Sequence, residues 1–285
     1  MESRRPSNGS DALPWAHLRL PPFPQVALQV LKLVDDENLS LRRLSDLISA
    51  DAAFANEVLI VANSMRYALR FPATSIMQAI AVLGLRTLQG LCVTVGVRAY
   101  LGKQMAEPAL RNVWRHNLAC ALIAEQLGSL GTGDKNVAYT AGILHDVGRV
   151  ALAVVRPKAY AVLLNEYRGP ADGILDGERV LFGMDHCDTG RQLVEEWKLP
   201  EALAAPVTKH HQPRRSDGEW DTAELIKVSC RLADAVGFPA FTGCEPAPYD
   251  ELLKELPDRE RELFQVDAPT LAAEITKSIQ VIERA

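Results

Sequence analysis

The sequence predicts an all-α fold with an N-terminal helical bundle lobe followed by a second helical lobe. Apolar residues recur at three-to-four spacing, as in Val26, Val30, Leu31 and Val34, and this is the period of one helix face. Short polar residues of the type that caps helices precede several of these apolar runs. The alternation of polar and apolar residues that would indicate strands is rare anywhere in the chain.

The first third of the chain predicts a leader followed by a bundle of short helices. Residues 1–19 are polar and contain Pro, Ser, Asn and Gly, so we expect a mostly disordered leader. Helical periodicity begins at Leu20. Ser40, Asp51 and Thr74 are expected to cap the helices that follow them. The helices expected in this part cover residues 41–49, 52–64, 75–83 and 85–100.

The composition turns polar around residues 102–108, and we place the boundary between the lobes there. Pro157 and Pro200 suit the first turn of a helix, where the missing N–H costs nothing. The helices expected in the remainder cover residues 108–127, 134–155, 157–167, 172–182, 185–197, 200–211, 222–236 and 268–282. The predicted parts of the chain are the leader 1–19, an N-terminal lobe 20–104, a second lobe 105–240 and a C-terminal helical extension 241–285.

Length and composition exclude several classes of protein. The 285 residues suffice for one large domain or two closely packed ones. The net charge is −5, and no basic block is longer than Arg4-Arg5 or Arg214-Arg215, which argues against nucleic-acid binding. The five cysteines are odd in number and form no CxxC pair, so a disulfide framework is not expected. Without a secretory h-region or a membrane-length apolar run, we predict a cytoplasmic protein with no membrane partner.

Histidine and aspartate residues gather in the second lobe. Five of the six histidines fall between positions 116 and 211. With two aspartates they place a ligand-type group, or an adjacent pair, on each of five expected helices: His116, His145-Asp146, His186, His210-His211 and Asp234. Zinc-finger ligands come in close pairs, so this spacing fits instead a site in the middle of a helical bundle. Imidazole and carboxylate ligands suit Fe, Mn, Zn, Ni or Co.

The surroundings of His145-Asp146 also predict a metal. The pair is expected in the middle of a buried helix, because its neighbours on both sides are apolar. An unpaired buried carboxylate is costly, and a cation is one of the few partners that makes it tolerable. Gly142 and Gly148 flank the pair, and each costs about 1 kcal/mol relative to alanine inside a helix. Close approach of a neighbouring helix or of a metal shell would offset that cost.

Each candidate ligand also has a simpler explanation. His116 could be a hydrogen-bonded core histidine, and His186 an exposed residue in the first turn of its helix. His210 and His211 could be cations that the helix dipole favours at a C-terminus. Asp234 could be a polar residue at a helix end.

Four other residues lie close to the candidate ligands in the sequence. Cys120 and Cys230 are each one helical turn from a candidate ligand, on matching faces, and we expect them to be small buried packing residues. Arg149 and Lys209 are the basic residues best placed to contact a phosphate, and a solvated face is the simpler alternative for both.

A series of longer motifs occurs in a fixed order over residues 20–237: LPPFPQVALQVLKLVDDENLSLRRLSDLISAD, VLIVANSM, TSIMQAIAVLGL, AGILHDVGR, FGMDHCDTGRQLVEEWKLP and KHH. With these motifs the chain resembles the HDOD (HD-related output domain) family of bacterial signalling proteins. That family belongs to the HD superfamily of metal-dependent phosphohydrolases and is related to the HD-GYP phosphodiesterases. The HD signature is a distant His, an adjacent His-Asp and a later Asp.

The resemblance implies an all-helical fold, with the N-terminal lobe packed on an HD-like lobe. It further implies two groups of metal ligands that share one bridging carboxylate. The first group would be His116, His145, Asp146 and Asp234. The second would be His186, His210 and His211, with Asp146 as the bridge. In an enzyme of this kind Asp146 would be catalytic, and Arg149 and Lys209 would offset the phosphate charge.

The chain departs from the HD-GYP enzymes at several positions. The stretch QPRRSDGEW after His211 lacks the Gly-Tyr-Pro motif, Arg149 stands where a Lys is usual, and Asn112 replaces a Glu. One hypothesis is therefore a regulatory module that keeps a metal site and acts on signalling proteins through direct contacts. The second is a metal-dependent phosphohydrolase acting on a nucleotide or cyclic nucleotide. The third is a helical adaptor without metal. We favour the module.

Overall fold

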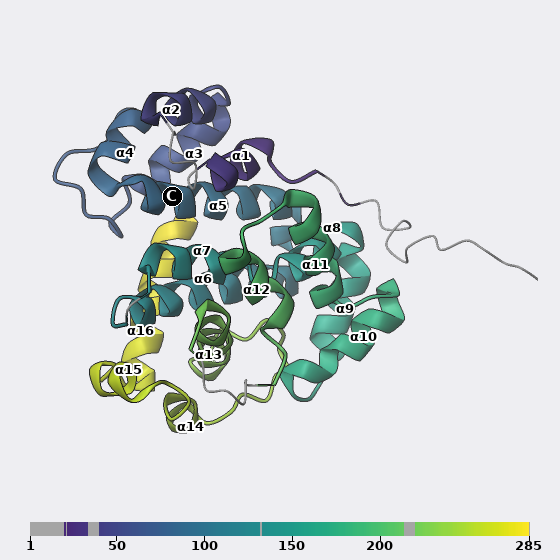
Figure 1. Cartoon of the computed structure of the whole chain (residues 1–285). Helices are drawn as coiled ribbons and strands as arrows, with labels where there is room; N and C mark the ends of the chain where they lie inside the picture. The colour runs from purple at the N-terminus through teal and green to yellow at the C-terminus, as the bar shows by residue number, and fades with distance from the viewer. Residues whose placement is uncertain (1–19, 21, 34–39, 132, 214–219, 285) are drawn as a thin grey trace, which may run out of the picture.

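The structure is a computed structural model that describes residues 20, 22–33, 40–131, 133–213 and 220–284. Within these ranges it contains helices and no strand, and an isolated bridge pairs Gly169 with Cys244. The predicted all-α fold is confirmed. The helices form two groups that meet along α5 (Leu85–Leu101), which runs between them in Figure 1. The leader expected over residues 1–19 lies outside the described residues.

Short helices cover one side of α5: α1 (Gln25–Leu33), α2 (Leu41–Ser49), α3 (Ala52–Ala62) and α4 (Ile76–Leu83). Asp51 caps α3 as predicted, because its carboxylate accepts a hydrogen bond from Phe54 N–H at 3.0 Å. The cap of α4 is Ser75 rather than the predicted Thr74. Ser75 Oγ accepts from Gln78 N–H at 3.2 Å, whereas the Thr74 hydroxyl donates to the Gln78 side chain.

The other side of α5 is covered by the second half of the chain. It contains η2 (Gly102–Ala106), α6 (Pro108–Gly128), α7 (Lys135–Leu144), α8 (Val147–Val155), α9 (Pro157–Glu166), η3 (Ala171–Gly173), α10 (Ile174–Phe182), α11 (His186–Trp197), α12 (Glu201–Lys209) and α13 (Thr222–Ala235). The extension contains α14 (Tyr249–Leu253), α15 (Asp258–Leu263) and α16 (Ala268–Arg284). Helices α14 and α15 are not among the predicted helices, because helices of one or two turns are too short to show an apolar period.

The helix predicted over residues 134–155 is two helices. Asp134 caps α7 through a 2.8 Å hydrogen bond from Asn136 N–H, but α7 ends at Leu144. His145 and Asp146 form the turn between α7 and α8, and the backbone of Asp146 leaves the helical region with φ −102° and ψ 25°. The expectation that this pair lies inside a continuous helix is therefore wrong. The pair lies at a helix junction.

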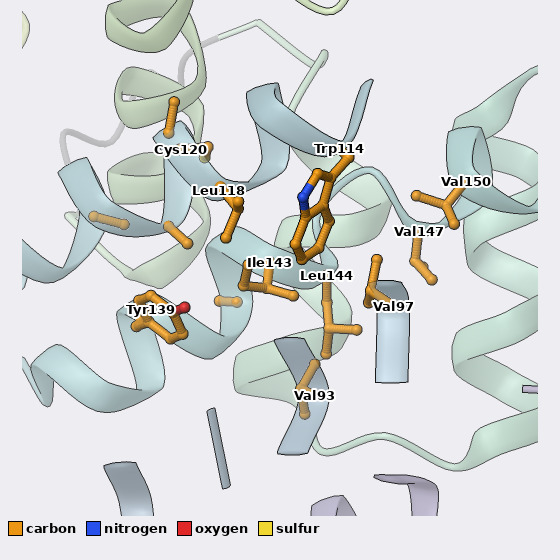
Figure 2. Packing of buried hydrophobic residues seen from close by; sticks show 14 of the residues in the cluster. Val93, Val97, Trp114, Leu118, Cys120, Tyr139, Ile143, Leu144, Val147 and Val150 are labelled. Atoms are coloured by element: carbon orange, nitrogen blue, oxygen red, sulfur yellow. The ribbon is translucent and has the colours of Figure 1, made fainter. Parts of the chain in front are cut away.

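The apolar core is continuous through both groups of helices. Helix α6 packs against α7 and α13, and α7 packs against α5. Figure 2 shows Trp114 of α6 beside Leu144 of α7, with Val93 and Val97 of α5 in the same cluster. The predicted boundary near residues 102–108 coincides with the break between α5 and α6, but the core crosses it. The division at residues 104 and 240 stays a prediction.

The two glycines beside the His145-Asp146 turn allow helices to approach closely. A Cβ atom on Gly142 would lie 2.5 Å from Ala121 Cα on α6. A Cβ atom on Gly148 would lie 1.9 Å from the carbonyl oxygen of His186 at the start of α11. The cost of glycine in these helices is thus offset by packing against neighbouring helices, which is one of the two explanations expected from the sequence.

The segment Lys135–Val155, which covers α7 and α8, is long and apolar enough to cross a membrane by composition alone. However, 89% of its apolar window is buried inside the protein. Burial against α5, α6 and α11 accounts for its apolar character, since core helices pass the same test.

Candidate metal centre

Five neighbouring elements bring the predicted ligands together. They are α6 (His116), the α7–α8 turn (His145, Asp146), the first residue of α11 (His186), the end of α12 (His210, His211) and the last turn of α13 (Asp234). All are buried except His211, which is partly exposed. The five imidazole rings form a continuous chain in which the centroids of neighbouring rings lie 4.3–5.5 Å apart. Residues that are far apart in the sequence thus form one cluster.

Hydrogen bonds on the outer side orient three of these rings. Nδ1 of His145 lies 2.7 Å from Gly142 O, and Nδ1 of His210 lies 3.0 Å from Pro206 O. A carbonyl oxygen only accepts, so these Nδ1 atoms carry the hydrogen and Nε2 presents a lone pair to the cluster. His211 is oriented in the same way by Asp172, at 2.6 Å from Nδ1. This is the arrangement that metal-ligating histidines usually have.

Three inward-facing atoms have no hydrogen-bond partner: His145 Nε2, Asp146 Oδ1 and His210 Nε2. They are buried and lie within 4.8 Å of one another, with His210 Nε2 3.2 Å from Asp146 Oδ1. Burial lowers the pKa of His210, whereas Arg149 helps to hold the pKa of Asp146 well below its usual range against the effect of burial. A neutral imidazole and a carboxylate therefore face each other with lone pairs. A cation bound at His145 Nε2 would satisfy that atom and bring positive charge to the other two.

The two nitrogens of His116 have different neighbours on and beyond α13. Nδ1 lies 2.8 Å from Phe238 O and 3.3 Å from Asp234 Oδ1, so its hydrogen points towards these two acceptors. Nε2 lies 3.3 Å from Cys230 Sγ. The ligand atoms of His116, His145 and Cys230 lie within 4.8 Å of one another. Asp234 is thus placed behind the His116 ring, and the thiol of Cys230 is placed on the side that faces His145.

Arg149 lies inside the cluster rather than at its entrance. It is 2% exposed, and its Nε donates to Asp146 Oδ2 at 2.7 Å. Arg149 Nη1 also lies 3.5 Å from Glu178 Oε1. The same oxygen accepts a hydrogen bond from the Tyr160 hydroxyl at 2.6 Å. Glu178 and Tyr160 were not found from the sequence, because a single Glu in a helix and a Tyr in another carry no signal of a shared buried network.

His186 is held between Glu178 and Arg149. Its Nδ1 lies 2.6 Å from Glu178 Oε2, and its Nε2 lies 3.2 Å from Arg149 Nη2 and 3.3 Å from Asp146 Oδ1. Burial and Arg149 oppose protonation of this ring, but Glu178 and Asp146 help to raise its pKa to about 10. A neutral His186 accepts from Arg149 at Nε2, and a protonated ring forms ion pairs with Glu178 and Asp146. In both protonation states the Nε2 atom of His186 already interacts with other protein groups. It also lies within 4.8 Å of ligand atoms of Cys187, His210 and His211, which together form a second converging set.

The structure does not place the two predicted phosphate-contacting residues at an open site. Lys209 has a side chain that is 49% exposed and lies 3.5 Å from Glu201 at the surface. Arg149 is buried and paired, as described above. The phosphate contacts of both residues stay predictions, and in this structure Arg149 contacts a protein carboxylate.

A cavity of about 480 Å³ reaches one end of the cluster. Among its lining residues are His210, His211, Cys230 and Asp234, while Asp146 is 1% exposed and does not line it. The two basic side chains in the described part of its wall are already paired: Lys227 with Glu224 at 2.7 Å, and Arg231 with Glu255 at 2.6 Å. Arg214 and Arg215 lie outside the described residues.

The network around Glu178 predicts that the free energy of unfolding decreases at acid pH. Burial opposes ionisation of Glu178, but His186 and Arg149 outweigh it and hold its pKa at about 2. Because this pKa is below that of an unfolded chain, the ionised group stabilises the fold above about pH 4.5 by about 3 kcal/mol. This contribution is lost as the pH falls from about 4.5 towards about 2.

Urea unfolding with a chelator should therefore show a large gap between wild type and Glu178→Gln at neutral pH, and a smaller gap at about pH 3. Glu251→Gln is the control, because Glu251 is 61% exposed and its ion pair contributes little at any pH. A gap for Glu178→Gln that stays constant with pH would contradict the assignment.

The fold and the cluster define a class of protein: an all-α chain with an HD-type group of histidines and aspartates buried between its helices. The sequence profile of the HDOD domain matches residues 20–213. The chain belongs to the HDOD domain family. It is also 24% identical over 246 residues to an uncharacterized protein of Treponema pallidum, a match that covers 83% of this chain and 45% of the length of that relative.

Solved structures share the fold. An HDOD domain protein of unknown function from Geobacter sulfurreducens superposes with a TM-score of 0.67 at 24% identity, covering 93% of this chain and 92% of that one. A candidate phosphohydrolase from Shewanella amazonensis SB2B gives 0.62 at 21% identity, covering 93% and 94%. A candidate signal transduction protein from Marinobacter aquaeolei VT8 gives 0.64 at 21% identity, covering 94% of this chain and 59% of that one.

Proposed function

We propose that this protein is a signalling module that holds one divalent metal ion in a closed HD-type site around His145 and acts through contacts with other proteins. The observation that carries the proposal is the burial of Asp146 under Arg149. Asp146 is 1% exposed, and Arg149 Nε donates to its Oδ2 at 2.7 Å. A catalytic metal site keeps an open position for water and substrate, whereas a structural site is closed. A carboxylate that is covered by a protein cation favours the closed kind.

The number of ions follows from the groups that are free to bind. His145 Nε2 belongs to both sets of converging ligand atoms, one with Asp146 and His210 and the other with His116 and Cys230. A second ion would need His186 as a ligand, but Nε2 of His186 is already engaged by Arg149. The guanidinium of Arg149 also brings one positive charge to Asp146. Because His145 Nε2 can ligate only one ion, we propose a single divalent ion, which would satisfy that atom and bring positive charge to Asp146.

The signalling role rests on the relatives and on the surface. The Marinobacter protein is named for signal transduction and is longer than this chain, as is the Treponema relative, which fits a domain that works beside other segments. Large apolar side chains are exposed in the N-terminal half, namely Met65 at 81%, Phe71 at 74% and Val82 at 60%. Such side chains are available for contacts with other proteins. Signalling proteins are therefore the partners that we propose, and a nucleotide is a possible small ligand.

One observation favours the alternative of a metal-dependent phosphohydrolase. The 480 Å³ cavity reaches His210 and His211, so a nucleotide-sized molecule could approach the edge of the cluster. The charges in its wall oppose this reading. Asp172, Asp234 and Glu245 line it, and the lysine and arginine in its described wall are already paired with carboxylates. A phosphate would meet net negative charge there unless metal ions supplied the balance.

Metal binding and turnover test the two functions together. Protein purified without a chelator or a polyhistidine tag should contain about one divalent ion per chain. At a free metal concentration of about 100 times Kd, the ion should stabilise the fold by about 2.7 kcal/mol. His145→Ala should abolish that increment. Ile143→Val is the matched control: Ile143 is fully buried two residues away on α7, and the change costs about 1 kcal/mol while the metal increment stays.

The same preparations, loaded with Mn, Fe or Zn, should not hydrolyse bis-p-nitrophenyl phosphate or a panel of cyclic and linear nucleotides. Turnover that disappears in His145→Ala would overturn the module in favour of the phosphohydrolase. Wild-type protein that binds no metal at all would overturn the metal site itself.

A further inference from the structure

Helix α13 presents two groups to the cluster, and they lie on opposite sides of one ring. Cys230 and Asp234 are one turn apart on the same face of α13, and each is 8% exposed. Asp234 Oδ1 lies 3.3 Å from His116 Nδ1, whereas Cys230 Sγ lies 3.3 Å from His116 Nε2. The HD signature takes its last ligand from the position of Asp234. In this structure the two groups face different nitrogens of His116. The tautomer of His116 therefore determines which of them lies beside a lone pair.

The tautomer of His116 is determined by the backbone. Phe238 O lies 2.8 Å from Nδ1, and a carbonyl oxygen can only accept a hydrogen bond. The hydrogen of neutral His116 is therefore on Nδ1, and its lone pair is on Nε2. Asp234 shares the Nδ1–H with Phe238 O and so orients the ring from behind, as carboxylates commonly do for metal-ligating histidines. Cys230 lies on the side of the lone pair, where a metal ion would bind.

A third group completes the set on that side. His145 Nε2 is buried without a hydrogen-bond partner, and the ligand atoms of His116, His145 and Cys230 all lie within 4.8 Å of one another. Ligands at about 2.0–2.3 Å from a tetrahedral ion are roughly 3.4–3.7 Å apart, so the 3.3 Å between His116 Nε2 and Cys230 Sγ needs only a small adjustment. Cys230 also lines the 480 Å³ cavity, which offers an ion a path to the site.

We propose that Cys230, and not Asp234, is the ligand that α13 contributes, so that His116, His145 and Cys230 form a thiolate-containing site selective for zinc or a similarly thiophilic ion. This inference rests on the proposed metal-binding function and names its ligands and metal class. Binding releases the thiol proton to solvent, because the thiolate is the form that ligates. Imidazole and thiolate together prefer zinc to manganese or magnesium, which prefer oxygen ligands. Asp234 is a positioning residue for His116.

Cobalt reports directly on a sulfur ligand, because thiolate coordination to Co²⁺ adds a charge-transfer band in the near ultraviolet. Wild-type protein titrated with Co²⁺ should show this band, saturating at about one ion per chain. Cys230→Ser should lose the band. Cys92→Ala is the control, since Cys92 is buried on α5 outside the converging ligand sets of the described residues, and the band of this variant should be unchanged. Asp234→Asn should keep the band and weaken binding by about 10–100-fold.

The outcomes separate this inference from the proposed function. Stoichiometric Co²⁺ binding without the band, or a band that survives in Cys230→Ser, overturns the role of Cys230 and leaves the metal site intact. Failure of wild-type protein to bind Co²⁺ or Zn²⁺ overturns the proposed function. If Cys230→Ser does not fold, X-ray absorption of the zinc-loaded wild type decides the matter. A zinc–sulfur shell at about 2.3 Å supports the inference, and a shell of nitrogen and oxygen alone overturns it.

Discussion

An alanine at Gly148 should destabilise the protein by about 3 kcal/mol or more. The added Cβ atom would lie 1.9 Å from His186 O and 2.6 Å from Gly190 N. Both are backbone atoms of α11, so no side-chain rotation relieves the contact, and α8 and α11 must move apart. This separation would also pull His186 away from Asp146. Urea unfolding in the presence of a chelator measures the loss.

Gly133→Ala is the control for this change. A Cβ atom on Gly133 meets no heavy atom within 4 Å, so the substitution should leave stability unchanged or raise it by up to about 1 kcal/mol. Equal stability of Gly148→Ala and wild type would show that α8 and α11 do not need this close contact. The packing explanation for the glycine would then be wrong.

Replacing Arg149 by methionine should cost about 3–5 kcal/mol in the metal-free protein. The change keeps much of the side-chain volume but leaves the carboxylates of Asp146 and Glu178 buried without the guanidinium that pairs with both. Removing one partner of a buried ion pair is costly because the other charge stays desolvated. Chemical unfolding at neutral pH with a chelator is the measurement.

Two further variants test whether the loss comes from the buried network. Arg191→Met breaks a surface ion pair between Arg191, 49% exposed, and Asp188, 41% exposed. This change should lower the free energy of unfolding by no more than about 1 kcal/mol. Glu178→Gln in the Arg149→Met background should cost less than the sum of the single changes, with a coupling of about 1–3 kcal/mol. Additive losses, or an Arg149→Met as mild as Arg191→Met, would contradict the network described above.

The helices could be predicted from the sequence because the interactions that define them are local. Asp51 accepts from an N–H three residues ahead, and the apolar residues of α2 and α5 recur at a helical period, so those helices were located to within a residue or two. The break at His145-Asp146 was missed for the opposite reason. Nothing in the apolar pattern of residues 134–155 changes there, and the turn is stabilised by the packing of Gly142 on α6 and Gly148 on α11.

The identity of most cluster residues was also contained in the sequence. Histidines and aspartates are uncommon in apolar helices, so the motif with His145 and Asp146 stands out. The ordered motifs indicate the HDOD family, which the sequence profile confirms. Cys230 was visible one turn from Asp234, but its residue type is equally common as core packing. The sequence therefore determined the all-α class, the family and the set of candidate ligands.

Only the tertiary structure decided how those residues are used. Which nitrogen of His116 carries the hydrogen depends on the carbonyl oxygen of Phe238, which lies 122 residues further along the chain. The placement of Arg149 over Asp146, and its pairing with Glu178 on α10, likewise depend on helices that meet only in the folded protein. Side-chain direction is determined by such distant contacts, and a residue type or spacing carries no record of them.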